Sequence, residues 1–224
     1  MAEALAPWLI ALAVGAAAWC LFWPDPYGAS VAVNVVLPWI AVAVIAASKG
    51  DVLFEGPSGT GKPCLAWVLI AATAALFWDA EVDAHTLNDT MPILLGAVLG
   101  AGLILAHTAA DRMVWRRASW IFIPFMLVYG WATVDLSNVL LDRSAPQTFQ
   151  TTVESKFSTS GRTIAHYLVL APWGPRHDTT DLKVHFPQYT AVQTGAPACV
   201  QLHDGAFGIP WFAVACLPPP KNPS

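Results

Sequence analysis

Charged side chains are scarce in this sequence: lysine and arginine supply 11 of its 224 residues, and aspartate and glutamate supply 15. The formal charge of −4 leaves no basic excess of the kind that neutralises nucleic-acid phosphates, so we expect no nucleic-acid partner. The hydrophobic fraction of 56% and the mean hydropathy of +0.53 are far above those of an ordinary soluble domain. They predict the lipid bilayer as the main partner.

Catalytic motifs are also missing. The sequence contains no Gly-x-Ser-x-Gly elbow, no His-Glu-x-x-His and no Cys-x-x-Cys, so we expect no enzyme activity, no cofactor and no metal site. One alternative is a metal or acid–base site assembled by folding from the polar side chains His166, His177, His185, His203, Asp178, Asp181 and Asp204. The acidic stretch 79–90 lacks the spacing of a calcium-binding loop, and we expect it to be a solvated loop.

One stretch resembles a phosphate-binding loop. Val52 to Pro63 reads VLFEGPSGTGKP and is similar to the nucleotide-binding loop of AAA-type ATPases, with Gly56, Gly61 and Lys62 at the expected spacing. The next position should carry a hydroxyl that holds magnesium, but here it is Pro63. We therefore interpret Gly56 to Lys62 as a chance match and expect no nucleotide.

Long apolar runs dominate the first part of the chain. Crossing a bilayer takes about 20 apolar residues, and the runs that approach this length are 4–23, 30–48, 63–78, 91–110 and 118–134. They predict a helical membrane domain over residues 1–141 with about five transmembrane helices. We expect the first run to be retained, because Met1 to Ala6 contains Glu3 and no basic residue, unlike a signal peptide.

The basic residues in the connectors between these runs predict the orientation, because lysine and arginine resist translocation. They lie only on alternate connectors and are Lys49, Lys62, Arg112, Arg116 and Arg117. This places the N-terminus in the cytoplasm and everything after the fifth run on the opposite face. We expect a protein of the plasma membrane, in bacteria the inner membrane, with its C-terminal domain on the periplasmic or extracellular side.

The C-terminal part has a different pattern. From residue 142 the chain is polar and rich in β-branched residues, and apolar and polar side chains alternate at 149–157 and 164–171. Further strands are expected at 182–186, 198–202 and 209–217. Residues 142–217 are predicted to form a small exported all-β domain, an antiparallel barrel or sandwich. The proline-rich tail 218–224 is predicted to be disordered.

The sequence predicts specific structural roles for a few residues. Cys199 and Cys216 lie in the exported domain, where a disulfide would survive, and two free buried thiols are the alternative. Gly96 and Gly100 form a small-xxx-small pattern that suits close helix packing within the chain or between two copies. Asn34 lies in the second run, where it is expected to join helices or, alternatively, to line a solute path.

The layout resembles that of uncharacterised bacterial inner-membrane proteins that end in a compact exported β domain. The residues that carry the resemblance are YLVLAPWGP at Tyr167 to Pro175 and GAPACVQLHDGAFGIPW at Gly195 to Trp211. It implies the fold and an envelope location but no activity. We expect a non-enzymatic membrane protein whose β domain binds or scaffolds an envelope protein, with the helices as its anchor and as the surface of a homo-oligomer. The alternative is a small-solute transporter or channel with a path lined by Asn34 and Thr73.

Overall fold

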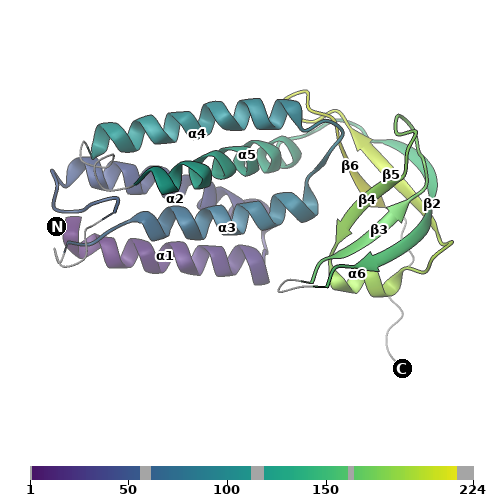
Figure 1. Ribbon diagram of the computed structural model, residues 1–224, viewed down its shortest axis with the longest axis horizontal. Coiled ribbons are helices and arrows are strands. Elements are labelled where there is room, and N and C mark those ends of the chain that lie inside the picture. The colour runs from purple at the N-terminus through teal and green to yellow at the C-terminus, as the bar shows by residue number, and fades with distance from the viewer. Residues whose placement is uncertain (1, 56–61, 112–118, 161–163, 216–224) are drawn as a thin grey trace. The chain divides into compact units, whose positions relative to one another are not determined.

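The computed structural model describes residues 2–55, 62–111, 119–160 and 164–215 (Figure 1). The chain forms two compact units. Unit 1 contains residues 1–80 and 89–140 and is helical, and unit 2 contains residues 81–88 and 141–224 and is mainly β. Unit 2 is therefore discontinuous, because residues 81–88 are separated from the rest of it by two helices of unit 1.

The helical unit is built from α1 (Ala2–Phe22), α2 (Tyr27–Ala47), α3 (Ala66–Asp83), α4 (Thr90–Ala110) and α5 (Ile123–Leu140) (Figure 1). A short 3-10 helix, Ser119–Phe122, precedes α5. The last turn of α3 reaches into the residues of unit 2. Helix α4 packs against α5, and α1 packs against α2. Large buried side chains fill this unit, including Leu37, Leu69, Leu76, Leu103 and Tyr129.

Four helices of the described residues are long and apolar enough to cross a membrane: Ala4–Phe22, Tyr27–Ala47, Thr90–Ala110 and Trp120–Leu140. The predicted count of about five is corrected at the third run, 63–78. This run does form a helix, but α3 begins at Ala66 and continues through Asp79, Glu81 and Asp83. These acidic residues shorten its apolar length, so α3 is not among the four.

The predicted antiparallel β domain is confirmed. Its sheet has six strands in the order β1-β6-β5-β2-β3-β4, and all neighbours are antiparallel. The strands are β1 (His85–Thr86), β2 (Gln147–Ser158), β3 (His166–Leu170), β4 (Thr180–Val184), β5 (Pro197–His203) and β6 (Trp211–Ala215). A short helix, α6 (Phe186–Ala191), follows β4.

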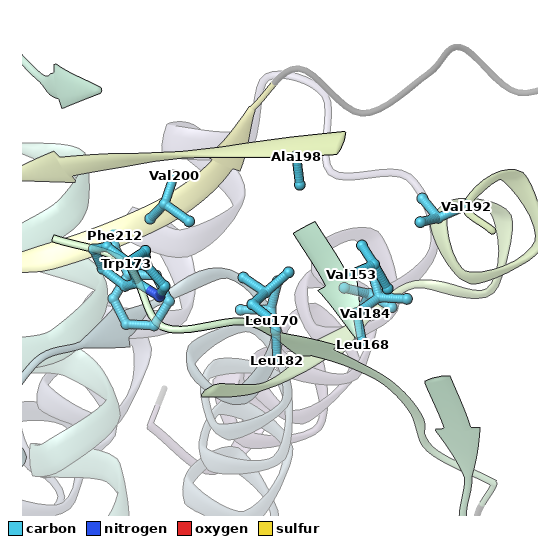
Figure 2. Packing of buried hydrophobic residues seen from close by; sticks show 10 residues of the cluster. All are labelled: Val153, Leu168, Leu170, Trp173, Leu182, Val184, Val192, Ala198, Val200 and Phe212. Atoms are coloured by element: carbon cyan, nitrogen blue, oxygen red, sulfur yellow. The ribbon is translucent and has the colours of Figure 1, made fainter. Parts of the chain in front are cut away.

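Strand β2 curls the sheet toward a barrel. Its first half, 147–152, pairs with β5, and its second half, 153–158, pairs with β3. A register shift between Val153 and Ser155 separates the halves, and such bulges bend a strand and increase its twist. The inward side chains of all the longer strands consequently meet in one core. Figure 2 shows its ten buried members: Val153, Leu168, Leu170, Trp173, Leu182, Val184, Val192, Ala198, Val200 and Phe212.

Candidate functional site

Charged side chains of the β unit gather where its sheet comes closest to closing. We call this place the seam: edge strand β4 on one side and residues 81–88, which contain edge strand β1, on the other. Lys183 Nζ lies 3.5 Å from Glu81 Oε2, and His185 Nε2 lies 3.7 Å from Asp83 Oδ1. The second contact is an ion pair when the imidazole is protonated. Pairs as exposed as these contribute about 0–1 kcal/mol each.

His85 lies inside the seam. Its ring is 5.7 Å from the ring of Phe212 in the β core, and the backbone of Lys183 in β4 hydrogen-bonds to the imidazole. Burial lowers the pKa of His85 below its usual 6.5, and the negative charge of Asp83 only partly opposes this effect. The imidazole is therefore neutral near pH 7 and links β1 to β4 as a hydrogen-bonding group.

Backbone and arginine contacts hold residues 81–88 in place. Leu87 N donates to Pro210 O at 2.9 Å, and His85 and Thr86 pair with Phe212 and Trp211. Arg176 Nη2 donates to the carbonyl oxygens of Thr86 at 3.4 Å and Leu87 at 3.3 Å. The guanidinium also lies 5.7 Å from the ring of Phe212, within reach of a cation–π contact. This short segment is thereby an integral part of the β unit.

A cavity of about 100 Å³ remains at the seam, lined by side chains that include Val82, His85, Lys183, Gln188 and Val214. Ligand pockets usually measure about 300 Å³ or more, whereas about 30 Å³ accommodates one water. The seam cavity is therefore of a size for water molecules rather than for a drug-sized ligand. Its polar lining gives such water hydrogen-bonding partners.

A second polar node lies at the start of the β unit. The Asp142 carboxylate accepts hydrogen bonds from Trp211 Nε1 at 2.7 Å, Ser144 N at 2.8 Å, Ser144 Oγ at 3.0 Å and Gly205 N at 3.1 Å. Burial by itself would raise the pKa of Asp142, but these hydrogen bonds outweigh it and lower the pKa to about 2. His203 stacks on Trp211 with 4.2 Å between ring centroids. The node joins the chain entering β2 to the β5–β6 hairpin.

The histidines considered for a metal or acid–base site each have a separate setting. His166 contacts Ser158, Phe186 and Tyr189, His185 faces Asp83, His203 stacks on Trp211, and His177 is exposed in a loop. Within the described ranges, no group of three or more His, Cys, Asp or Glu side chains is placed to hold a metal ion. The structure therefore does not bring this candidate set together.

Asn34 joins two helices of unit 1. Its Nδ2 donates to Ala16 O in α1 at 3.1 Å and to Ser30 O in its own helix at 3.0 Å. Nearby, Cys20 Sγ in α1 donates to Asp79 Oδ2 in α3 at 3.0 Å. Sequence reasoning missed this contact, because it assigned Asp79 to a solvated loop. Asp79 is instead buried.

Gly96 and Gly100 lie where α4 meets α5. A Cβ added at Gly100 would lie 2.7 Å from Met126 O and 3.0 Å from Leu127 Cα, and one added at Gly96 would overlap the backbone of Trp131. Gly130 of α5 faces both glycines. The three glycines allow the two backbones to approach more closely than any side chain would permit.

Three sequence predictions fall at least partly outside the described residues, and one of them, the disordered tail 218–224, lies wholly outside. Cys199 is buried in β5 opposite Ala215, but Cys216 is not described, so the disulfide stays a prediction. In the loop resembling a nucleotide-binding motif, residues 56–61 are not described either. Lys62 is described, and its Nζ donates to Gly50 O at 2.6 Å.

Sequence reasoning also missed strand β1 and the seam. A weak signal was present in the sequence: apolar Val82 and Ala84 alternate with polar Glu81, Asp83 and His85, a period of two that is typical of strands, although residues 81–83 form the end of α3. The segment was overlooked because it is short and lies between two long helices.

Comparisons with known proteins leave the chain without an assigned relative. No protein-family model, no curated protein and no solved structure matches it. The resemblance to bacterial inner-membrane proteins therefore stays a prediction from the quoted residues alone.

Proposed function

We propose that this chain is a non-enzymatic integral membrane protein whose helices anchor a β unit that binds or scaffolds a protein partner in the cell envelope. The four long apolar helices support the anchor. The alternating basic connectors support a cytoplasmic N-terminus and a β unit on the far side of a plasma membrane. Cys199 and Cys216 form a disulfide in this proposal, as suits an oxidising compartment.

The observation that carries the binding role is a set of exposed apolar side chains at one end of the β unit. We call it the apolar end: Phe157 at the end of β2, Ile164 before β3 and Phe186 at the start of α6. Their exposed fractions are 42%, 62% and 60%. Strand register places Phe157 and Phe186 at the same end of the strands but on opposite faces of β3, because Phe157 pairs with Tyr167 whereas Phe186 lies beside His166, which pairs with Val184. Apolar side chains that gather on a surface often mark a site of protein interaction.

Aromatic contacts hold this end in a defined shape. Phe157 stacks on Tyr167 with 5.0 Å between ring centroids and 9° between the planes. On the other face of β3, His166 lies 5.1 Å from Phe186 and 4.7 Å from Tyr189. Rigid aromatic groups lose little conformational entropy on binding, which suits them as anchors for a partner.

The binding role is tested by chemical crosslinking in intact membranes followed by capture of the full-length chain. We expect the double variant Phe157→Ser/Phe186→Ser to lose specific crosslinked species that the unchanged chain gives. Phe207→Ser is the matched control, because Phe207 is also exposed but lies in the β5–β6 loop, at the other end of the strands. A crosslinking pattern that is the same for all three chains would contradict the proposal.

The orientation is tested separately by a reporter fused after Asp142. We expect periplasmic or extracellular reporter activity. Cytoplasmic activity would show that the β unit lies on the same side as the N-terminus and would invert the proposed topology.

The transport alternative has less support. Both donors of the Asn34 amide bind backbone carbonyls, which is a packing role. Thr73 faces a cavity whose walls are otherwise apolar. Solute flux into liposomes that requires the reconstituted protein would nevertheless favour transport over anchoring.

A further inference from the structure

The two edges of the β sheet meet at the seam without a ladder of backbone hydrogen bonds. Strands β1 and β4 are the first and last strands of the sheet, and in the described part of the chain neither has a second neighbour. Strand β1 pairs with β6, whereas ion pairs and one imidazole connect residues 81–88 to the β4 side. Closure of the sheet on this side therefore depends on the charges of a few groups.

His85 is the centre of this connection. Its ring lies 5.7 Å from the ring of Phe212, and the backbones of Val82 and Lys183 hydrogen-bond to the imidazole. Val82 belongs to the same segment as His85 and Lys183 belongs to β4, so the imidazole joins the two sides of the seam. His85 also lines the seam cavity, whose polar walls admit water.

The charged groups around His85 act in opposite senses. The Asp83 carboxylate favours a protonated imidazole, whereas the Lys183 ammonium opposes it. Helix α6 and strand β6 line the cavity with uncharged side chains. The charged and titratable groups of the seam and its border are Glu81 and Asp83 of the same segment, Lys183 and His185 of the β4 side, and Arg176 of the loop after β3.

Protonation of His85 is unfavourable while the seam is closed. Burial lowers the pKa of the imidazole below 6.5, and Asp83 only partly offsets this effect. When residues 81–88 move away from β4, the ring is solvated and its pKa returns to the ordinary value. The open seam therefore binds the proton more readily, so closure is most favourable above pH 6.5 and weakens as the pH falls.

We propose that the seam is an acid-sensitive latch, in which protonation of His85 releases residues 81–88 from β4 while the ladders of the sheet stay paired. The contacts that break are the two ion pairs and the imidazole bridge. His185 opposes release, because its protonation strengthens the contact with Asp83. Opening uncovers the outer edge of β4. The latch uses residues of the β unit alone and does not depend on the partner in the proposed function.

Hydroxyl-radical footprinting of the full-length chain in lipid nanodiscs tests the latch, because the radical oxidises side chains that water reaches. The reporters are Val82 and Leu182, which line the seam cavity and are 7% and 3% exposed. We expect their oxidation rates to rise by up to about fivefold between pH 6.5 and pH 5.5, since opening takes up one proton. Leu168 and Val200 in the β core should stay protected at both pH values.

Three glutamine variants identify the group that titrates. His85→Gln keeps a hydrogen-bonding side chain but takes up no proton, so the acid-induced rise should disappear. His185→Gln should give a larger rise, because the contact with Asp83 that resists opening is lost. His177→Gln, in an exposed loop, should respond like the unchanged chain.

The proposal fails if oxidation of the two reporters rises equally in His85→Gln and in the unchanged chain. It also fails if the two core residues become oxidised in parallel with the reporters, because the whole β unit then unfolds. Should His85→Gln not fold, a carbodiimide crosslink between Glu81 and Lys183 in the unchanged chain decides the outcome. The crosslink holds the seam closed and should suppress the rise, and a rise that persists would overturn the proposal.

Discussion

Trp211 Nε1 donates a hydrogen bond of 2.7 Å to Asp142 Oδ2, across 69 residues of sequence. The same oxygen accepts hydrogen bonds from Ser144 Oγ and Gly205 N. One carboxylate thereby connects the chain that enters β2 with the hairpin that ends the described sheet. The first two predictions follow from this arrangement.

Asp142→Asn is expected to destabilise the β unit. The amide keeps the size of the carboxylate but loses its charge and turns an NH₂ group toward donors that need an acceptor. Hydrogen bonds to charged groups contribute about 1.5–3 kcal/mol, so we expect a loss of about 2 kcal/mol in unfolding free energy, measured by urea titration. Asp178→Asn, in an exposed loop, should change it by less than about 0.5 kcal/mol. Equal stabilities of the two variants would contradict the assigned role.

Protonation of Asp142 should lower the unfolding free energy at acid pH. The pKa of this carboxyl is about 2 in the folded chain and 3.8 ordinarily. The unfolded state therefore binds more protons between these values, and the stabilisation present above pH 3.8 is lost as the pH falls toward 2. We expect Asp142→Asn to flatten this part of the curve in urea titrations between pH 2 and pH 5. An unchanged slope would show that other carboxylates cause the acid sensitivity.

His85 should cause a second pH dependence of the unfolding free energy, closer to neutral pH. Burial lowers the pKa of its imidazole in the folded state, and the charge of Asp83 and the backbone hydrogen bonds with Val82 and Lys183 only partly oppose this shift. The unfolded state consequently binds more protons just below the ordinary value of 6.5, so unfolding free energy should rise as the pH passes upward through 6.5. His85→Gln should remove this rise, and His177→Gln, in an exposed loop, should retain it. Urea titrations between pH 5 and pH 8 provide the measurement.

The α4–α5 contact predicts opposite effects for two glycines of one helix. Gly100→Val would force the added side chain against Met126 O, and overpacking of this kind costs about 1–3 kcal/mol. Gly102→Ala is the control, because no described atom lies within 4 Å of its added Cβ. The alanine should stabilise α4 by up to about 1 kcal/mol. Thermal unfolding in detergent would distinguish the two, and a tolerated Gly100→Val would exclude close helix packing at this point.

The predicted bridge between Cys199 and Cys216 has a direct test. Closing a loop of this size should contribute about 3 kcal/mol, so Cys199→Ser and Cys216→Ser should each lower stability by about that amount under oxidising conditions. Cys64→Ser, at a free cysteine in the helical unit, is the control. Reductant should abolish the difference between the unchanged chain and the first two variants. Alkylation of all four cysteines without reductant would exclude the bridge.

Much of the fold could be predicted because long periodic patterns depend on local sequence. The alternation of Leu168 and Leu170 with Tyr167 and Val169 predicts a strand over 164–171, and the structure has β3 at His166–Leu170. The fifth apolar run, 118–134, is likewise helical for most of its length, because α5 spans Ile123–Leu140. A strand buries one face and a helix buries one stripe of its surface. The spacing of apolar residues in the sequence reflects this burial directly.

The candidate sites were less predictable because they depend on contacts between distant segments. Nothing near Asp79 in the sequence indicates that Cys20 will donate to it, and nothing near Asp142 indicates Trp211. The cavity beside Thr73 depends on the separation of two helices rather than on any motif. The acidic character of 81–83 predicted solvation, whereas Lys183 and His185 of β4 lie beside Glu81 and Asp83 in the folded chain.

The place of β1 within the chain affects how the protein is made. A ribosome delivers His85 and Thr86 long before their pairing partners Phe212 and Trp211 emerge. Until then the nascent segment has nothing to pair with, although helices α3 and α4 on either side of it have already been synthesised. Assembly of the β unit is therefore a late, post-translational event, during which chaperones would find unpaired strand edges. Expression of 141–224 as an isolated fragment would omit β1 and leave the pairing edge at Trp211 and Phe212 uncovered, so a soluble version should carry residues 81–88 grafted beside β6.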